Sequence, residues 1–236
     1  MKLKTLTQIG LFCFLGLTNI PSLAETPSSR VYSKLDQFDV PVGRWEAGQE
    51  DGLPAIFVRG DLWEGRAETE SSAVFNGIFK GLDETFLDSI KAFMFFPLAL
   101  VKDSEFQEGA LSIRVKPLRG EVDQGAGIAF GMENPASYWV VRLNALENNV
   151  MLFEWVKGRR QARHSYKVSL ESIRWYTLTA SIQGKTLKAY LDGQLLFNYD
   201  LGRPVKGKFG LWSKSDSVVA FRELTFTPLT AAGIKK

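Results

Sequence analysis

YWVVRLNALENNVMLFEW, residues 138–155, sets out two apolar segments with a polar turn between them. Apolar segments of this length on either side of such a turn are typical of two antiparallel β-strands. Arg142 and Asn144 share the parity of Tyr138 in the first segment, so the period-2 geometry of a strand places all three side chains on one face of a sheet. The stretch therefore predicts a hairpin that carries a charged group and an amide on one face.

Short segments of the same character continue along the chain from about residue 105. They are ALSIRVKPL, GAGIAFGM, SYKVSL, WYTLTASI, KTLKAYL, QLLFNYD, KFGLWS and VVAFRELTF. Three dipeptides between them predict tight hairpin turns, namely Lys157-Gly158, Gln183-Gly184 and Asp192-Gly193. The number of segments favours two packed antiparallel sheets over one, so the sequence predicts an all-β sandwich.

The part of the chain before residue 105 is less regular. Strands are expected at 45–46, 55–59 and 95–101, with a polar stretch at 64–72. Phe86, Leu87, Ile90, Phe93 and Met94 form one apolar stripe if residues 83–93 are helical, with Asp83 as the N-cap. A helix laid against a sandwich buries such a stripe, and a partner-docking helix or a lid beside a cleft are the alternatives.

The first 24 residues have the pattern of a signal peptide. Lys2 and Lys4 precede an apolar core at 9–17, and Ser22-Leu23-Ala24 is a small-residue cleavage pattern. No later stretch approaches the roughly 20 apolar residues that a membrane helix needs. We therefore expect a signal peptide at 1–24 and a single exported domain at 25–236, periplasmic or secreted, with no membrane span after cleavage.

Composition excludes several classes of function. Without residues 1–24, which hold two of the 29 basic residues and no acidic one, 27 basic side chains stand against 26 acidic ones. A near-neutral chain without runs of like charge lacks the footprint of a nucleic-acid binder. The only cysteine, Cys13, lies in the expected signal peptide, and His164 is the only histidine. Disulfides, thiol chemistry and clustered histidine or cysteine metal sites are therefore excluded from the mature domain.

Two motifs in the middle of the chain fall short of a known chemistry. The segment GAGIAFG at 125–131 lacks the strand–loop–helix context of a dinucleotide site, and close packing of strands explains its glycines better. Glu121-Val122-Asp123 begins like the carboxylate strand of laminarinase-type glucanases, but Ala126 stands where a third acid is expected. Neither motif identifies a site by itself.

Polar side chains gather near the hairpin turn and near a second segment. Glu147 and Asn148 follow Arg142, and this group suits either a polyhydroxylated ligand or a structural ion pair. Lys214 and Asp216 share the parity of Trp212, so all three line one side of the chain if the strand continues through them. These residues are the candidate site.

The chain resembles the exported 3-keto-disaccharide hydrolase-like domain family of the concanavalin A-like lectin and glucanase superfamily. The resemblance covers roughly 95–226 and rests on FFPLALV, IRVKPLRGEVDQGAGIAF, YWVVRLNALENNVMLFEWVKGRR, YLDGQLLF and GKFGLWSKSDSVVAFRELTF. It implies a jelly-roll sandwich that holds a saccharide on a concave sheet or adjacent loops. The polar motif of the family falls on Arg142, Asn144, Glu147, Asn148, Lys214 and Asp216, and characterised relatives cleave 3-keto-glycosides.

Three functions remain open. In the first, the protein binds a carbohydrate or glycoside. Arg142 and Lys214 donate hydrogen bonds to this ligand, and Trp212 stacks on a sugar ring. Asn144 and Asn148 orient its hydroxyls, while Glu147 and Asp216 accept from them. In the second, a glycoside or 3-keto-glycoside hydrolase, Glu147 and Asp216 are the catalytic acid and base, with Ca²⁺ as an optional aid. In the third, Arg142–Glu147 and Lys214–Asp216 are structural ion pairs of a non-catalytic scaffold.

Overall fold

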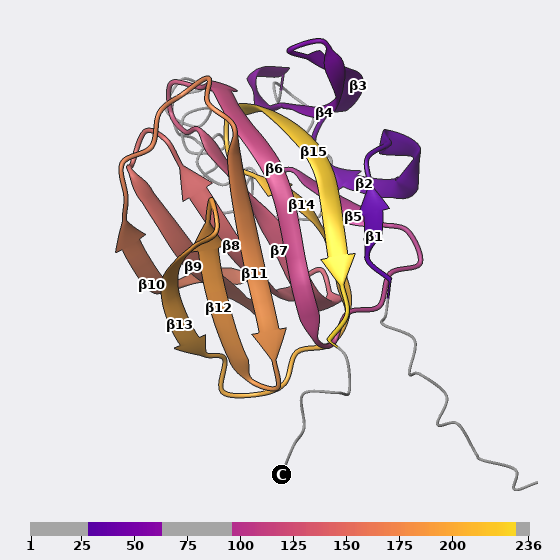
Figure 1. Ribbon diagram of the computed structural model, residues 1–236, viewed down its shortest axis with the longest axis vertical. Coiled ribbons are helices and arrows are strands. Elements are labelled where there is room, and N and C mark those ends of the chain that lie inside the picture. Colours follow the sequence, from indigo (N-terminus) through magenta and orange to yellow (C-terminus); the bar gives the residue numbers. More distant parts are fainter. Residues whose placement is uncertain (1–27, 63–95, 230–236) are drawn as a thin grey trace, which may run out of the picture.

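The alternating segments form antiparallel strands in two sheets that pack face to face (Figure 1). The computed structural model describes residues 28–62 and 96–229. The expected signal peptide, the polar stretch at 64–72 and the expected helix at 83–93 lie outside these residues. Within the two described stretches, no helix is long and apolar enough to cross a membrane.

The front sheet faces the viewer in Figure 1 and contains eight strands among the described residues. In lateral order they are β13 (Gln194–Asp200), β12 (Thr186–Leu191), β11 (Tyr176–Gln183), β6 (Gly109–Arg119), β15 (Val218–Thr227), β4 (Leu53–Arg59) and β3 (Trp45–Glu50), with β1 (Arg30–Tyr32) paired to β15. A short 3-10 helix, η2 (Gly60–Leu62), follows β4.

The back sheet lies behind it and contains seven strands among the described residues. Their lateral order is β10 (Arg159–Lys167), β9 (Asn149–Val156), β8 (Ser137–Asn144), β7 (Gly125–Asn134), β14 (Lys208–Ser213), β5 (Leu98–Val101) and β2 (Phe38–Val42). A second 3-10 helix, η1 (Leu35–Gln37), precedes β2. The two sheets confirm the predicted all-β sandwich.

The hairpin at 138–155 forms as predicted. Strand β8 pairs with β9 so that Tyr138 lies opposite Trp155 and Arg142 opposite Met151. Two of the predicted turns have both central residues in the left-handed region, as a type I′ hairpin requires: φ is 51° and 75° at Lys157-Gly158, and 49° and 81° at Asp192-Gly193. In the third, β11 runs through Gln183, so the turn consists of Gly184 and Lys185.

The main core lies between the sheets because most strands direct apolar residues of one parity inward. Phe106 is fully buried there, with its ring centroid 6.2 Å from that of Phe130 and 5.6 Å from that of Phe226. On β7, a methyl group added to Gly127 would overlap the carbonyl oxygen of Val141. Close strand packing is therefore the reason for a glycine in this part of GAGIAFG.

A second apolar cluster lies on the opposite face of the back sheet, called the outer face below. Its buried members are Leu98, Leu100, Ala129, Met132, Tyr138, Val140, Phe153, Trp155 and Trp212. Side chains alternate along a strand, so this face also receives Arg142 and Asn144. The back sheet therefore contributes to two clusters, and only one of them lies between the sheets.

Candidate functional site

Four aromatic rings on the outer face pack into one group, called the outer aromatic cluster. Tyr138 and Trp155 stack with their centroids 4.5 Å apart and their planes at 11°. Phe96 stacks on Trp212 at 5.7 Å and 18°. Trp155 meets Trp212 edge to face at 5.9 Å. Strands β8, β9 and β14 and the residue two before β5 thus bring these four rings into one packed cluster.

Arg142 lies beside this cluster and is only 1% exposed. Its Nη2 donates to Glu147 Oε2 at 3.0 Å and its Nη1 donates to Asn149 Oδ1 at 3.1 Å. The guanidinium carbon is 5.4 Å from the centroid of the Phe153 ring. The expected Arg142–Glu147 ion pair is therefore present, at the border between the hairpin turn and the aromatic surface.

Asp123 and Lys214 form a second, deeper ion pair. The Lys214 ammonium contacts Asp123 Oδ2, and Asn144 Nδ2 donates to Asp123 Oδ1 at 2.6 Å. All three residues are buried. Burial raises the pKa of the Asp123 carboxyl, and the hydrogen bond and charge of Lys214 offset part of that rise.

Gly125 makes room for the two ion pairs to meet. A Cβ at this position would lie 2.8 Å from Asp123 Oδ1, 3.5 Å from Lys214 Cβ and 3.6 Å from Arg142 Cδ. Any larger residue would displace the Asp123 carboxylate. A glycine at the start of β7 therefore lets a loop residue, a β8 residue and a residue after β14 converge.

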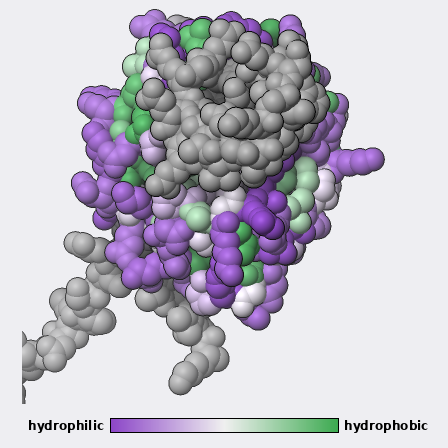
Figure 2. Space-filling model, turned by 180° about the vertical axis from the view of Figure 1, so that it is seen from behind, coloured by the Kyte–Doolittle hydropathy of each residue, from purple (hydrophilic) through white to green (hydrophobic). Residues whose placement is uncertain are grey.

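Glu147 is the water-facing member of this charged cluster, with 41% of its side chain exposed. Partial burial alone would raise the pKa of its carboxyl, but the charge of Arg142 and the hydrogen bond from Asn149 outweigh that effect and lower it. Figure 2, which shows the molecule from the side of the back sheet, has mostly hydrophilic side chains on the described surface, with smaller apolar areas between them. The charged cluster thus has an ionised carboxylate at its solvent edge.

Two buried N–H donors of the outer face have no hydrogen-bond acceptor. They are Arg142 Nε and Arg160 Nη1. Arg142 is 1% exposed, and the fully buried Trp212 indole shares a hydrogen bond with Tyr138. Almost all buried polar groups in proteins find a partner, so donors left open on one face indicate a place where acceptor atoms of a ligand bind.

Two of the predicted site residues lie elsewhere. Asn148 has φ of 51° in the hairpin turn, and its Oδ1 accepts from Leu170 N at 2.8 Å, so it holds the chain that follows β10. Asp216 accepts from the backbone N–H groups of Glu121 and Asp123 at 2.6 and 2.9 Å. Both side chains serve loop structure.

The expected shared face of Trp212, Lys214 and Asp216 does not form. Strand β14 ends at Ser213, and Ser215 has φ of 55° in the turn that follows. Lys214 therefore directly follows the end of β14, while the Asp216 side chain points toward the 121–123 backbone. Among the described residues, Lys214 pairs with Asp123, and the expected Lys214–Asp216 ion pair is absent.

Sequence reasoning missed Asp123 and Arg160. Asp123 belongs to the Glu121-Val122-Asp123 motif, which was set aside because its third acid is absent. Arg160 lies opposite Trp155 in the β9–β10 pairing, so the parity argument applied to Arg142 also finds it once the hairpin at Lys157-Gly158 is extended. Strand parity could therefore have identified Arg160 from the sequence, whereas the contacts of Asp123 arise only in the tertiary structure.

The calcium ion of the hydrolase alternative would need about six to eight oxygen ligands. Within residues 28–62 and 96–229, no group of three or more aspartate, glutamate, histidine or cysteine side chains gathers as a metal site. The described residues thus offer no carboxylate cluster for that ion.

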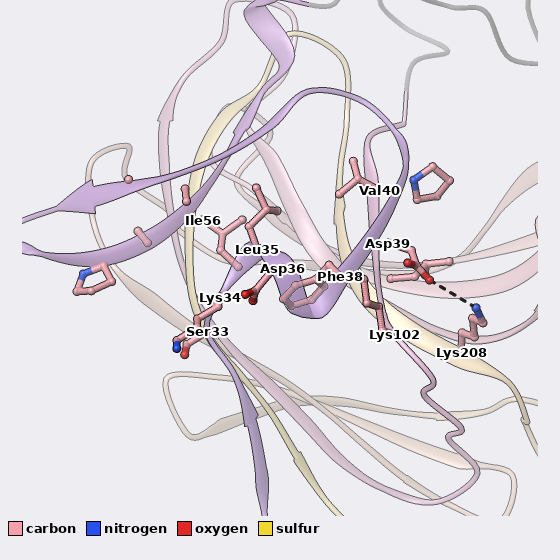
Figure 3. A pocket seen from close by; sticks show the side chains of 16 residues that line it. Ser33, Lys34, Leu35, Asp36, Phe38, Asp39, Val40, Ile56, Lys102 and Lys208 are labelled. Atoms are coloured by element: carbon pink, nitrogen blue, oxygen red, sulfur yellow. Dashed lines mark ion pairs between the residues drawn. The ribbon is translucent and has the colours of Figure 1, made fainter.

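A separate hollow of about 1010 Å³ lies where β2 and η1 face β3 and β4 (Figure 3). Lysines and aspartates line it, including Lys34, Lys102 and Lys208. Lys208 Nζ is 4.0 Å from Asp39 Oδ2. No residue of the outer-face clusters except Leu100 takes part, so this hollow is distinct from the candidate site.

No family model matches the chain, and no curated protein matches it. Several solved structures resemble it. The carbohydrate binding module CBM66 from Bacillus subtilis aligns with a TM-score of 0.59 and 14% identity, over 80% of this chain and 95% of that one. The Crh5 transglycosylase in complex with NAG aligns at 0.53 and 11%, over 87% and 86%.

A Bacillus subtilis protein of unknown function with a galectin-like fold aligns at 0.51 and 10% identity, over 83% of this chain and 91% of that one. At these identities the likeness concerns the fold alone. The class that the fold defines is an all-β sandwich of two antiparallel sheets. The narrower resemblance to the 3-keto-disaccharide hydrolase-like family stays a prediction.

Proposed function

We propose that this protein is an exported carbohydrate-binding β-sandwich that takes a saccharide or glycoside at the outer face of its back sheet. The observation that carries the proposal is the pair of buried arginine N–H donors without acceptors, Arg142 Nε and Arg160 Nη1, beside four aromatic rings. The pattern of a signal peptide at residues 1–24 supports export.

A sugar supplies what this face lacks. Its hydroxyl and ring oxygens accept hydrogen bonds, and its apolar C–H face stacks on aromatic rings. A buried donor left without a partner costs about 1–3 kcal/mol, so a ligand that satisfies both donors offsets two such penalties. The proximity of open donors to stacked rings therefore favours a saccharide over a purely apolar ligand.

We assign different roles to the predicted residues within this proposal. Arg142 donates to the ligand from Nε, and the Trp212 ring supports the partly exposed Phe96 ring, on which the sugar stacks. Asn144 is a positioning residue, because its amide is used by Asp123 and by the backbone N–H of Leu146. Glu147 accepts hydrogen bonds from ligand hydroxyl groups at the solvent edge. The fold likeness to a carbohydrate binding module is consistent with this proposal.

Titration of the purified chain against a panel of saccharides tests the proposal. We expect binding to a subset of them, and a roughly tenfold or greater loss of affinity, about 1.4 kcal/mol, in Arg142→Lys and in Trp212→Phe. Both variants keep the bulk of the side chain and change its donors. Isothermal titration calorimetry measures the affinities, and circular dichroism checks the fold.

Lys102→Met, in the hollow of Figure 3, is the matched control and should bind as the wild type does. If Lys102→Met weakens binding while Arg142→Lys and Trp212→Phe do not, the saccharide site is the hollow instead. Absence of binding to every saccharide of the panel would contradict the proposal.

A hydrolase is the second candidate, and one observation favours it. The pKa of Asp123 is raised by burial, while the pKa of Glu147, despite partial burial, is lowered by Arg142, and the two carboxyls belong to one cluster. Environments that push two carboxyl pKa values apart are typical of an acid and base pair. Asp123 thus replaces Asp216 as partner of Glu147, because the Asp216 carboxylate is occupied by backbone N–H groups.

Release of product from a chromogenic glycoside or a 3-keto-glycoside tests the hydrolase. Under this reading, Asp123→Asn and Glu147→Gln each lower kcat by about a hundredfold or more, because proton transfer is lost. Glu121→Gln, an exposed neighbour, should turn over at the wild-type rate. Equal turnover in all three variants, or none in the wild type, would leave binding as the function.

A further inference from the structure

Arg160 differs from the other cations of the outer face in its pairing. Arg142 pairs with Glu147 and Lys214 contacts Asp123. Among the described residues, no carboxylate pairs with Arg160. Its guanidinium carbon instead lies 5.0 Å from the centroid of the Phe96 ring and 4.9 Å from that of Phe153, and its buried Nη1 has no acceptor.

The charge on Arg160 is unfavourable as it stands. Burial, and then the positive charge of Arg142, lower the pKa of its guanidinium. The two guanidinium groups flank the same Phe153 ring. Contacts with aromatic rings stabilise a desolvated cation but do not supply the opposite charge that a buried cation favours.

Other arginines of the same strand and its surroundings do have acidic partners. Arg163 Nη2 lies 2.6 Å from Glu154 Oε2, and Arg203 Nη2 lies 3.1 Å from Glu154 Oε1. Glu154 has the opposite parity to Phe153 on β9, so this group faces away from the outer face. Among the described residues, the lack of an acidic partner for Arg160 is thus a local property of the outer face.

From this geometry we propose that the saccharide bound at the outer face carries a carboxylate, as a uronic acid does, and that this carboxylate pairs with Arg160. The inference rests on the proposed saccharide-binding function. A planar guanidinium matches a carboxylate through two parallel hydrogen bonds. Phe96, the partly exposed ring of the outer aromatic cluster, contacts Arg160, so a sugar ring stacked on Phe96 lies next to the guanidinium.

Position on the sheet supports access for such a group. Arg160 belongs to β10, the last strand of the back sheet, and lies opposite Trp155 in the pairing with β9. It is partly buried, with Nη1 facing inward. A carboxylate that enters from the β10 edge therefore meets Arg160 while the sugar ring lies beside the partly exposed Phe96.

The test compares ligands that differ only in charge. The full chain is titrated with galacturonate and glucuronate oligosaccharides, with their methyl esters, and with neutral and sulfated oligosaccharides of the same length. We expect the free acids to bind at least about tenfold more tightly than the esters and the neutral sugars, with an advantage that shrinks as salt increases. Tighter binding of the sulfated sugars than of the uronates would overturn the carboxylate assignment.

Three variants test whether Arg160 recognises the carboxylate. In Arg160→Met the preference for acid over ester should vanish while neutral binding persists, and in Arg160→Lys it should fall to an intermediate value because the planar fork is lost. Arg159→Met, the exposed neighbour on the other side of the strand, should keep the wild-type preference. Melting temperatures confirm that each variant folds.

The outcomes separate this inference from the proposed function. If neutral sugars and esters bind as tightly as the acids, the carboxylate proposal is wrong and saccharide binding stands. If Arg160→Met weakens neutral and acidic ligands equally, Arg160 only packs against the ligand, and the proposal is again wrong. If no saccharide of any charge binds, the proposed function itself fails.

Discussion

Lys214→Met should lower the free energy of unfolding by about 3–5 kcal/mol, because it removes the cation that contacts a fully buried carboxylate. The side chains of Lys214 and Asp123 are 4% and 0% exposed, so water does not replace the lost partner. The pKa of Asp123, already raised by burial, should rise further in the variant. Urea unfolding at neutral pH measures the difference.

Lys206→Met is the matched control for that variant. Lys206 Nζ lies 3.0 Å from Glu105 Oε1, with both side chains 63% exposed, so removal of this pair should change the stability by less than about 1 kcal/mol. Equal effects of the two substitutions would mean that the Asp123 pair is no more buried than a surface pair. A large loss in Lys214→Met with no saccharide binding by the wild type would favour the scaffold alternative.

Trp212→Ala should cost about 3–5 kcal/mol of stability, because it deletes a fully buried indole from the centre of the outer aromatic cluster. The Phe96 ring loses its stacking partner at 5.7 Å, and Trp155 loses an edge-to-face contact at 5.9 Å. Thermal unfolding followed by near-ultraviolet circular dichroism reports both the stability and the loss of fixed aromatic packing.

Trp175→Ala provides the comparison for Trp212→Ala. The Trp175 indole is partly buried, donates to Asp51 at 2.7 Å and lies 4.3 Å from the guanidinium carbon of Arg222. Its loss should destabilise the protein clearly less than loss of Trp212, since less apolar surface leaves water on folding. A smaller effect of Trp212→Ala than of Trp175→Ala would contradict the account of the outer face as a packed aromatic cluster.

The strands were predictable from the sequence because local patterns determine them. Parity placed Arg142 and Asn144 on the face of Tyr138, and the β8–β9 register confirms this arrangement. The turn residues Lys157-Gly158 and Asp192-Gly193 marked two hairpins because aspartate, lysine and glycine there take positive φ. For Gln183-Gly184 the same reasoning was one residue out of place.

The site was only partly predictable because its contacts join distant parts of the chain. The parity argument for Asp216 was wrong, since β14 ends at Ser213 and a turn separates the two residues. Asn148 was named as a ligand contact, but its amide oxygen accepts from a backbone group 22 residues later. No local pattern reports that Asp123 meets Lys214, since the contact exists only after the loop before β7 packs beside the end of β14.

The hydrogen bonds from the 121–123 backbone to Asp216 have a consequence for the affinity of the proposed saccharide site. Its carboxylate accepts from three successive N–H groups, of Glu121, Val122 and Asp123, at distances from 2.6 to 3.2 Å. These hydrogen bonds order the loop when the protein folds. For the proposed saccharide, a loop ordered in advance reduces the conformational entropy lost on binding, so this preorganisation by Asp216 would raise the affinity without contact with the ligand.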